Sequence, residues 1–182
     1  MKKALVEIIN SDQIGYMEKR FCGENTRLIA DIMEYSQKME IPGILLLIDF
    51  EKAFDTIKWN FLYQVLEHFN FGKCFIDWIK IIYNKVYSCV TNNGYSSTPF
   101  NITKGIRQGD PISALLFLPV VEILAILIRN NVHIKGYKIK GCEIKLCQLA
   151  DDTTLFVLDN DSLRIALKTF EEFYRYAGLG LN

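Results

Sequence analysis

The sequence predicts an α+β domain in which helices pack against an antiparallel sheet. Three observations predict it: apolar residues recur at helical spacing in several segments, one short aliphatic run reads as a strand, and two strand-like segments flank an Asp151-Asp152 turn. With 182 residues, half of them hydrophobic, the chain is long enough for one hydrophobic core. No low-complexity linker or internal repeat divides it, so we expect a single domain.

The first half of the chain alternates helical patterns with one strand. Apolar residues in the segment 25–39 have helical spacing. The run Ile44–Ile48 is continuously aliphatic, which predicts a strand buried on both faces, with Asp49 at its C-terminal end. Two further helical stripes are Trp59, Leu62, Leu66 and Phe69, and Phe75, Ile79, Ile82 and Val86.

The second half predicts a hairpin, a long helix, a strand pair and a final helix. Asn92-Asn93-Gly94 separates the strand-like segments 86–91 and 97–102, which is a hairpin signal. Asp110 and Pro111 supply an N-cap and a first helical residue, so we expect a helix from there to Arg129. The segments 144–149 and 153–158 form the strand pair around the Asp-Asp turn. The last amphipathic helix runs through Leu163, Leu167, Phe170 and Tyr174.

Cysteine usage and apolar run lengths exclude several classes of protein. The five cysteines are odd in number and none are spaced Cys-x-x-Cys, which argues against a zinc knuckle and a disulfide framework. There is no secretory signal, so we expect an intracellular protein, in the nucleus or cytoplasm and not secreted. The apolar stretch 112–128 is interrupted by Ser113, Pro119 and Glu122, which favours a buried helix over a membrane span.

The net charge is zero, because 21 basic residues balance 21 acidic ones. A nucleic-acid-binding protein is usually more basic. Residues 73–145 nevertheless carry ten basic and four acidic side chains (10 − 4 = +6), so the flanks are acidic. A basic centre suits contact with phosphates, although solvated lysines on a surface explain it equally well.

Three aspartates are the candidate chemical groups. Adjacent carboxylates in a partly buried turn repel each other, so Asp151 and Asp152 suggest a nearby cation; an ordinary exposed turn is the alternative. Asp49 could instead cap the helix that follows it. If the three converge, they would suit Mg²⁺, which prefers hard oxygen ligands, and two such ions serve phosphoryl or nucleotidyl transfer.

Ordered segments of the chain resemble the motifs of reverse transcriptases from non-LTR (LINE-like) retrotransposons. Residues 46–55 (LLIDFEKAFD) resemble their first catalytic motif, 105–113 (GIRQGDPIS) their Gln-Gly-x-Pro-x-Ser motif, and 150–153 (ADDT) their Ala-Asp-Asp box. Residues 12–16 (DQIGY) and 20–27 (RFCGENTR) are similar to a fingers segment, and 177–182 (AGLGLN) to the start of the next palm motif.

The resemblance implies a polymerase palm-like antiparallel sheet packed on helices. Residues 1–43 would be a fingers-like segment and 44–182 the palm, with the thumb absent. The implied activity is RNA-directed DNA synthesis, with an RNA template, a DNA primer, deoxynucleoside triphosphates and two Mg²⁺ or Mn²⁺ ions. We expect no membrane partner, and the resemblance names no protein partner.

The resemblance also assigns roles to individual residues. Asp49 and Asp151 would bind both ions, with Asp152 in support and the Phe50 carbonyl adding an oxygen. Phe54 would exclude a ribose 2′-hydroxyl, although packing in the core is the alternative.

Four further residues are candidates for binding the nucleotide. Gln108 and Gly109 would line the nucleotide and template side, where glycine permits close backbone approach; a simple turn is the alternative for Gly109. Arg20 and Arg27 would contact the triphosphate, because a guanidinium suits phosphate oxygens; solvated helix charges are the alternative.

Two features depart from the family's pattern. Leu149 stands where an aromatic residue usually precedes Ala-Asp-Asp, and the chain stops at Asn182, before an expected lysine and the thumb. A catalytically incompetent truncated remnant that only binds nucleic acid is therefore one alternative. A two-metal nuclease is another, although Phe54 and Gln108-Gly109 have no obvious task in hydrolysis.

Overall fold

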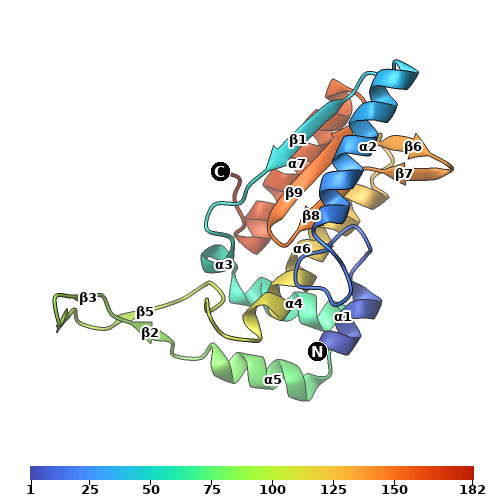
Figure 1. Ribbon diagram of the computed structural model, residues 1–182. Coiled ribbons are helices and arrows are strands. Elements are labelled where there is room, and N and C mark those ends of the chain that lie inside the picture. Colours follow the sequence, from blue (N-terminus) through green and yellow to red (C-terminus); the bar gives the residue numbers. More distant parts are fainter.

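The computed structural model describes residues 1–182 and confirms the α+β class (Figure 1). Its centre is a three-stranded antiparallel sheet with strand order β1-β9-β8. The elements are α1 (Lys2–Ile8), α2 (Gly23–Met39), β1 (Ile44–Ile48), α3 (Ala53–Thr56), α4 (Trp59–His68), α5 (Lys73–Ile82), β2 (Tyr87–Ser88), β3 (Thr91–Asn92), β4 (Tyr95–Ser96), β5 (Phe100–Asn101), α6 (Ser113–Asn130), β6 (Tyr137–Ile139), β7 (Cys142–Ile144), β8 (Leu146–Leu149), β9 (Asp152–Val157) and α7 (Asn160–Ala177).

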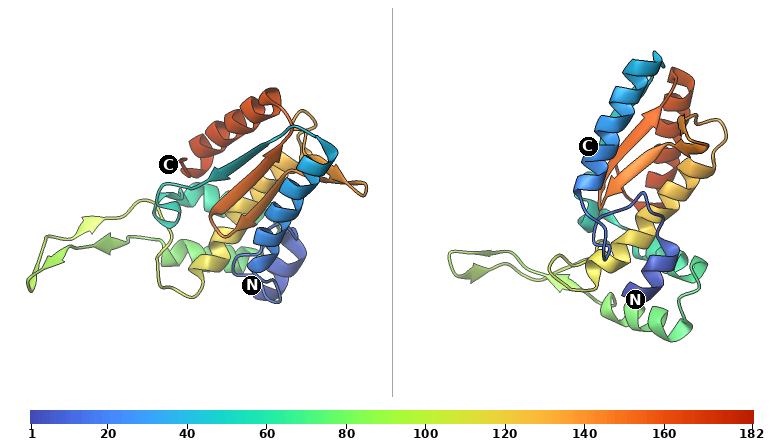
Figure 2. Two further views of the ribbon diagram at one scale, coloured as in Figure 1. Left: turned by 45° about the horizontal axis from the view of Figure 1, so that its top comes forward. Right: turned by 45° about the vertical axis from the view of Figure 1, so that its right-hand side comes forward.

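Helices cover both faces of this sheet (Figure 2). Because side chains alternate along a strand, Leu155 and Val157 of β9 point into the main core with α6 and α7. Phe156, between them, points the opposite way and packs in a smaller cluster with Ile32 of α2. The sheet is therefore the middle layer of three, which fixes the direction of every side chain at its ends.

The strand β1 is buried on one face only, so the prediction of burial on both faces was wrong. Its side chains Leu45 and Leu47 are 39% and 70% exposed. The reason is topological: β9 occupies the centre of the sheet and β1 lies at its edge, while α2 packs towards β8 on the other side. An aliphatic run does not reveal which strands have a neighbour on each side.

Helix α6 is buried, as the sequence predicted, and contributes many side chains to the main core. It is long and apolar enough to cross a membrane by length and composition alone, but 61% of it is buried inside the protein. It begins at Ser113 and not at Pro111, because the Asp110 carboxylate accepts a hydrogen bond from the Ile112 amide (3.1 Å) within a preceding turn. Asp110 therefore shapes the entry to the helix without being its N-cap residue.

The predicted hairpin is confirmed and forms a projecting arm, residues 86–102 (Figure 1). Its strands pair as β2 with β5 and β3 with β4. Asn93 and Gly94 have φ values of 49° and 80°, the pattern of a type I′ turn. Tyr95, beside the turn, is 82% exposed, and residues 87–101 are all exposed.

A second hairpin was not predicted. The expected strand 144–149 is divided into β7 and β8, and β7 pairs with β6 around Lys140-Gly141, whose φ values are 50° and 86°. Helix α1 at the N-terminus was also not predicted, and it packs on α6.

A largely buried ion triad ties the N-terminal loop to α6. The Arg129 guanidinium pairs with Asp12 (2.6 Å) and with Glu122, whose side chain is 2% exposed. Burial raises the pKa of both carboxyls, and the charge of Arg129 opposes that rise. The guanidinium is therefore what allows two acidic groups to remain in a largely dry environment.

Replacing Arg129 with Met should destabilise the protein by about 3–5 kcal/mol, because the buried Glu122 carboxyl and the mostly buried Asp12 carboxyl lose their partner. The pKa values of Asp12 and Glu122 would rise further above their unfolded values. A raised folded-state pKa favours the protonated form, so the loss should be largest near neutral pH and shrink as the pH falls. Urea denaturation at several pH values would measure this. Lys38→Ala, which breaks an exposed pair with Glu34 on α2, is the control and should change the midpoint little; equal effects of the two variants would contradict the prediction.

Candidate active site

The register of the sheet brings the three candidate aspartates to the same end. Ile48, the last residue of β1, pairs with Thr153 of β9, so Asp49 follows directly beside Asp152. Leu149 pairs with Asp152, which leaves Ala150 and Asp151 as a two-residue turn between β8 and β9. The predicted convergence of strand ends is therefore present in the backbone.

The electrostatics of these aspartates is that of a cluster. Burial raises the pKa of the Asp152 carboxyl, and the negative charges of Asp151 and then Asp49 raise it further. The three groups thus lie within range of each other's charge. Their side chains do not yet enclose an ion: no group of three or more His, Cys, Asp or Glu side chains is close enough to hold a metal as it stands.

The oxygen donors at this end of the sheet fit a hard cation in chemical type. The Phe50 carbonyl oxygen accepts no hydrogen bond, although the Phe50 side chain is buried. Asp49 is partly engaged, since its Oδ2 accepts a hydrogen bond from the Asn182 side chain (3.1 Å). A rotation of the Asp49 side chain would free this oxygen for a ligand.

The C-terminal residues lie against the same strand end. The Asn182 amide donates to the Asp49 carbonyl (3.0 Å), and the Glu51 amide donates to the Gly180 carbonyl (2.9 Å). These bonds flank an antiparallel bridge between Phe50 and Leu181. The backbone that carries Asp49 is therefore held from both sides, by β9 and by this terminal segment.

Phe54 packs against α6 and is partly exposed. Its ring stacks on Phe117 of α6 with centroids 4.7 Å apart, which favours the packing role. The residue is only partly buried, so part of it faces solvent. Its carbonyl accepts a hydrogen bond from the Ile106 amide (2.6 Å), which joins the first motif segment to the second.

Gln108 and Gly109 are exposed and lie beside the first motif segment. The Gln108 amide donates to the Asp55 carboxylate (3.1 Å), a contact that the sequence did not predict. Gly109 has a φ of 86°, and a side chain there would meet open space. Glycine is therefore favoured at this position by the positive φ and not by a lack of room. A cavity of about 730 Å³ adjoins Gln108. It is lined by Asp55, Lys85, Val86, Tyr87, Ser88, Ile102, Lys104, Gly105, Ile106, Arg107 and Gln108.

The two predicted triphosphate ligands, Arg20 and Arg27, bond other groups in the structure and pair with none of the three aspartates. The Arg20 guanidinium donates to the carbonyls of Ile9, Asn10 and Gln13, which favours a structural role in the N-terminal loop. Arg27 pairs with Asp31 on the exposed surface of α2 (2.8 Å), the arrangement of a solvated helix charge. Their roles at a triphosphate stay predictions.

A further contact at the aspartate turn involves Gln13, to which the sequence had assigned no role. Its side-chain amide bonds both the N–H and the carbonyl of Ala150. The signal available in the sequence was its place within the motif segment 12–16, but spacing could not show which atoms it would reach.

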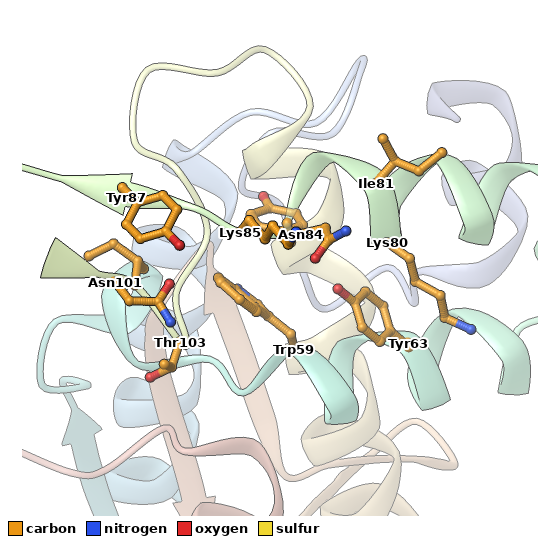
Figure 3. A pocket seen from close by; sticks show the side chains of 11 residues that line it. Trp59, Tyr63, Lys80, Ile81, Asn84, Lys85, Tyr87, Asn101 and Thr103 are labelled. Carbon is orange, nitrogen blue, oxygen red and sulfur yellow. The ribbon is translucent and has the colours of Figure 1, made fainter. Parts of the chain in front are cut away.

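A second cavity, of about 600 Å³, lies between α4, α5 and the base of the arm (Figure 3). Trp59, Tyr63 and Tyr87 line it together with Lys80 and Lys85. The Trp59 indole donates to the Gly105 carbonyl (2.7 Å), which fixes this wall to the second motif segment. None of the three aspartates lines this cavity, so it is separate from the candidate active site.

An antiparallel sheet backed by two helices, with aspartates at one strand end and in the neighbouring turn, is the palm-type arrangement of template-directed polymerases. A family model described as "Reverse transcriptase (RNA-dependent DNA polymerase)" matches residues 1–182. The chain therefore belongs to the reverse transcriptase family, and the resemblance seen in its motifs is confirmed.

The similar curated proteins come from mobile elements. The chain is 27% identical over its whole length to the "Transposon TX1 uncharacterized 149 kDa protein" of Xenopus laevis, and spans 14% of that protein. It is 26% identical over 93% of its length to the "Retrovirus-related Pol polyprotein from type-2 retrotransposable element R2DM" of Drosophila melanogaster, and spans 16% of that protein. The chain thus corresponds to a small part of each relative.

Solved telomerase structures share the fold. A telomerase from Candida tropicalis, in complex with a fragment of telomeric RNA, aligns with 99% of this chain and 31% of its own, with a TM-score of 0.68 at 12% identity. A telomerase from Candida albicans aligns with 89% of this chain and 29% of its own, with a TM-score of 0.63 at 12% identity. At such identities the likeness concerns the fold.

The aspartate cluster predicts a measurable coupling. Asp49→Asn should lower the pKa of the Asp152 carboxyl towards its ordinary value, because one of the charges that raise it is removed. Saturating Mg²⁺ should lower it in the wild-type protein for the same electrostatic reason. Carbon-detected NMR titration of the side-chain carboxyls would follow both changes. Asp77→Asn, on α5, is the control and should leave the Asp152 pKa unchanged. If neither Asp49→Asn nor Mg²⁺ changes the Asp152 pKa, the result would contradict the convergence of the three carboxylates.

Proposed function

We propose that this chain is the palm and partial fingers of an RNA-directed DNA polymerase from a retrotransposon, acting inside the cell, in the nucleus or cytoplasm. Residues 44–182 would form the palm and residues 1–43 the fingers-side segment. The substrates would be an RNA template, a DNA primer and deoxynucleoside triphosphates. The transposable-element origin of the curated relatives supports this assignment.

The observation that carries the proposal is the arrival of Asp49, Asp151 and Asp152 at one end of the sheet. Two Mg²⁺ or Mn²⁺ ions bound there would stabilise the charges on the attacking and leaving oxygens of an in-line displacement. Asp49 and Asp151 would hold both ions, with Asp152 and the Phe50 carbonyl completing the donor set. In the reaction, the primer 3′-hydroxyl would lose its proton to water and its oxygen would bond to the α-phosphorus, while the bond from that phosphorus to the α–β bridging oxygen breaks and pyrophosphate leaves.

The chain's other residues would bind and orient the nucleotide. The cavity beside Gln108 contains Lys85, Lys104 and Arg107, which suit phosphate oxygens, and a single carboxylate, that of Asp55. The Gln108–Asp55 hydrogen bond would keep the second motif segment at a fixed distance from the first. Gly109, with open space where a side chain would project, leaves its backbone accessible to a base or sugar.

Asp151→Asn should abolish metal-dependent incorporation while leaving the fold intact, because Asp151 is partly exposed, its carboxylate has no hydrogen-bond partner in the protein, and its replacement has the same shape. A loss of several kcal/mol of charge stabilisation corresponds to a fall of about 10³-fold or more in rate. Incubating wild-type and variant proteins with labelled primer–template, with and without deoxynucleotides, would measure it. Extension by the wild type alone supports polymerisation; degradation of the duplex would instead indicate a nuclease, and binding without extension a chain that only binds nucleic acid.

Phe54→Val should admit ribonucleotides more readily, since a smaller side chain beside the sugar leaves room for a 2′-hydroxyl. Single-nucleotide incorporation of matched deoxy- and ribonucleotides would give the ratio. Because Phe54 stacks on Phe117, thermal unfolding should be recorded in parallel, with Phe117→Leu as a packing control that does not face the nucleotide. Reduced stability with unchanged ribose discrimination would assign Phe54 to the core alone.

A further inference from the structure

The turn that carries the catalytic aspartate has an unfavourable backbone. Ala150 has a φ of 58°, and Asp151 is not among the residues with positive φ. A positive φ at the first central residue is the pattern of a type II′ turn, where glycine is preferred because it has no Cβ. Such a conformation persists only where its surroundings hold it.

Gln13 provides those surroundings. Its Nε2 donates to the Ala150 carbonyl (2.9 Å), and its Oε1 accepts from the Ala150 amide (2.8 Å). Oε1 also accepts from the Gly15 amide (2.7 Å). Gln13 is 0% exposed, so these bonds have no competition from water.

The loop that presents Gln13 is itself fixed to the strand leading into the turn. The Gln148 amide donates to the Asp12 carbonyl (2.7 Å), and the Ile14 amide donates to the Gln148 carbonyl (2.9 Å). Arg20 bonds the Gln13 carbonyl, and Asp12 is held by the Arg129 guanidinium. These bonds fix the backbone of Gln13 relative to the strand, and so they fix the position of its side-chain amide beside Ala150.

Gly15 leaves the room that this contact requires. A Cβ at position 15 would lie 2.1 Å from the Ala150 amide nitrogen and 2.6 Å from its Cα. Because both atoms belong to the backbone, any larger residue would push the turn away. The loop and the turn are therefore in direct contact as well as hydrogen-bonded.

We propose that Gln13 is a positioning residue for the catalytic turn: it holds Ala150 in the left-handed conformation and so sets the direction in which Asp151 and Asp152 present their carboxylates. This inference rests on the proposed function, in which these carboxylates bind divalent cations. Gln13 touches neither substrate nor ion and acts through the backbone of Ala150. Partners that orient a metal's ligands typically contribute about 10–100-fold to metal affinity.

The test measures Mn²⁺ binding to the full chain by the electron paramagnetic resonance of free Mn²⁺ at pH 7.5, with thermal unfolding alongside. Gln13→Met keeps the side-chain volume but removes all three hydrogen bonds, and should raise the Mn²⁺ Kd about 10–100-fold. Gln13→Glu keeps the acceptor for the Ala150 and Gly15 amides and should give an intermediate Kd. Its added negative charge would by itself favour a cation, so weaker binding reports the geometry of the turn.

Ser162→Ala is the matched control. Ser162 is also 0% exposed and bonds the Lys135 amide (3.0 Å), but it lies at the start of α7, away from the turn. It should lower the unfolding temperature without changing the Kd by more than about twofold. If Ser162→Ala and Gln13→Met raise the Kd equally, the effect of Gln13→Met would come from a general loss of stability, and the inference would be overturned.

The remaining outcomes separate this inference from the proposed function. Suppose that the wild type binds Mn²⁺, that Asp151→Asn abolishes this binding, and that Gln13→Met leaves the Kd unchanged. This result would overturn the role of Gln13 and would still support the metal site. No saturable Mn²⁺ binding by the wild type would overturn the metal site and the inference with it. If Gln13→Met fails to fold, Gln13→Glu decides: a Kd equal to that of the wild type overturns the inference, and a larger one supports it.

Discussion

The pairing of Ile48 with Thr153 is the constraint on which the rest of the candidate site depends. Side chains alternate between the faces of a sheet, so a slip of one residue would move Asp49 to the opposite face and separate it from Asp152. Burial enforces the register: Leu155 and Val157 must point towards α6 and α7, and Phe156 towards α2. The hydrophobic effect, acting on residues that have no part in chemistry, thus decides where the charged ones meet.

The acidic side chains of this chain are distributed so that the aspartates which repel each other lie outside the core. Glu122 of α6 is the one acidic residue in the buried class, and it is paired with Arg129. Acidic side chains that meet without a partner are confined to the end of the sheet, where water or a cation can reach them. The same Arg129 also pairs with Asp12, next to Gln13, so one partly buried guanidinium supports both the core and the loop behind the turn.

Sequence patterns predicted the elements well and their environment poorly. Periodicity located α2, α4, α6, α7 and the strand pair, because each buries a regular stripe of side chains. It failed for Leu45 and Leu47, since an aliphatic run gives no information about an edge position. The motif segments predicted that Asp49 and the Asp151-Asp152 pair would approach each other. Spacing could not predict that Arg20 would bond three carbonyls or that Gln13 would reach Ala150, because both contacts depend on the path of a loop.

The projecting arm has a practical consequence for handling the protein. Residues 87–101 are exposed throughout, and at the base of the arm the Ile102 amide bonds the Val86 carbonyl (2.8 Å), which closes the hairpin. Exposed hairpin tips accept insertions and are preferred sites of proteolytic cleavage. A fluorophore, an affinity peptide or even new chain ends could be introduced between Asn93 and Gly94, because neither residue touches the sheet. After a cut there, the two pieces would stay together through the shared core, much as a circularly permuted protein keeps its fold.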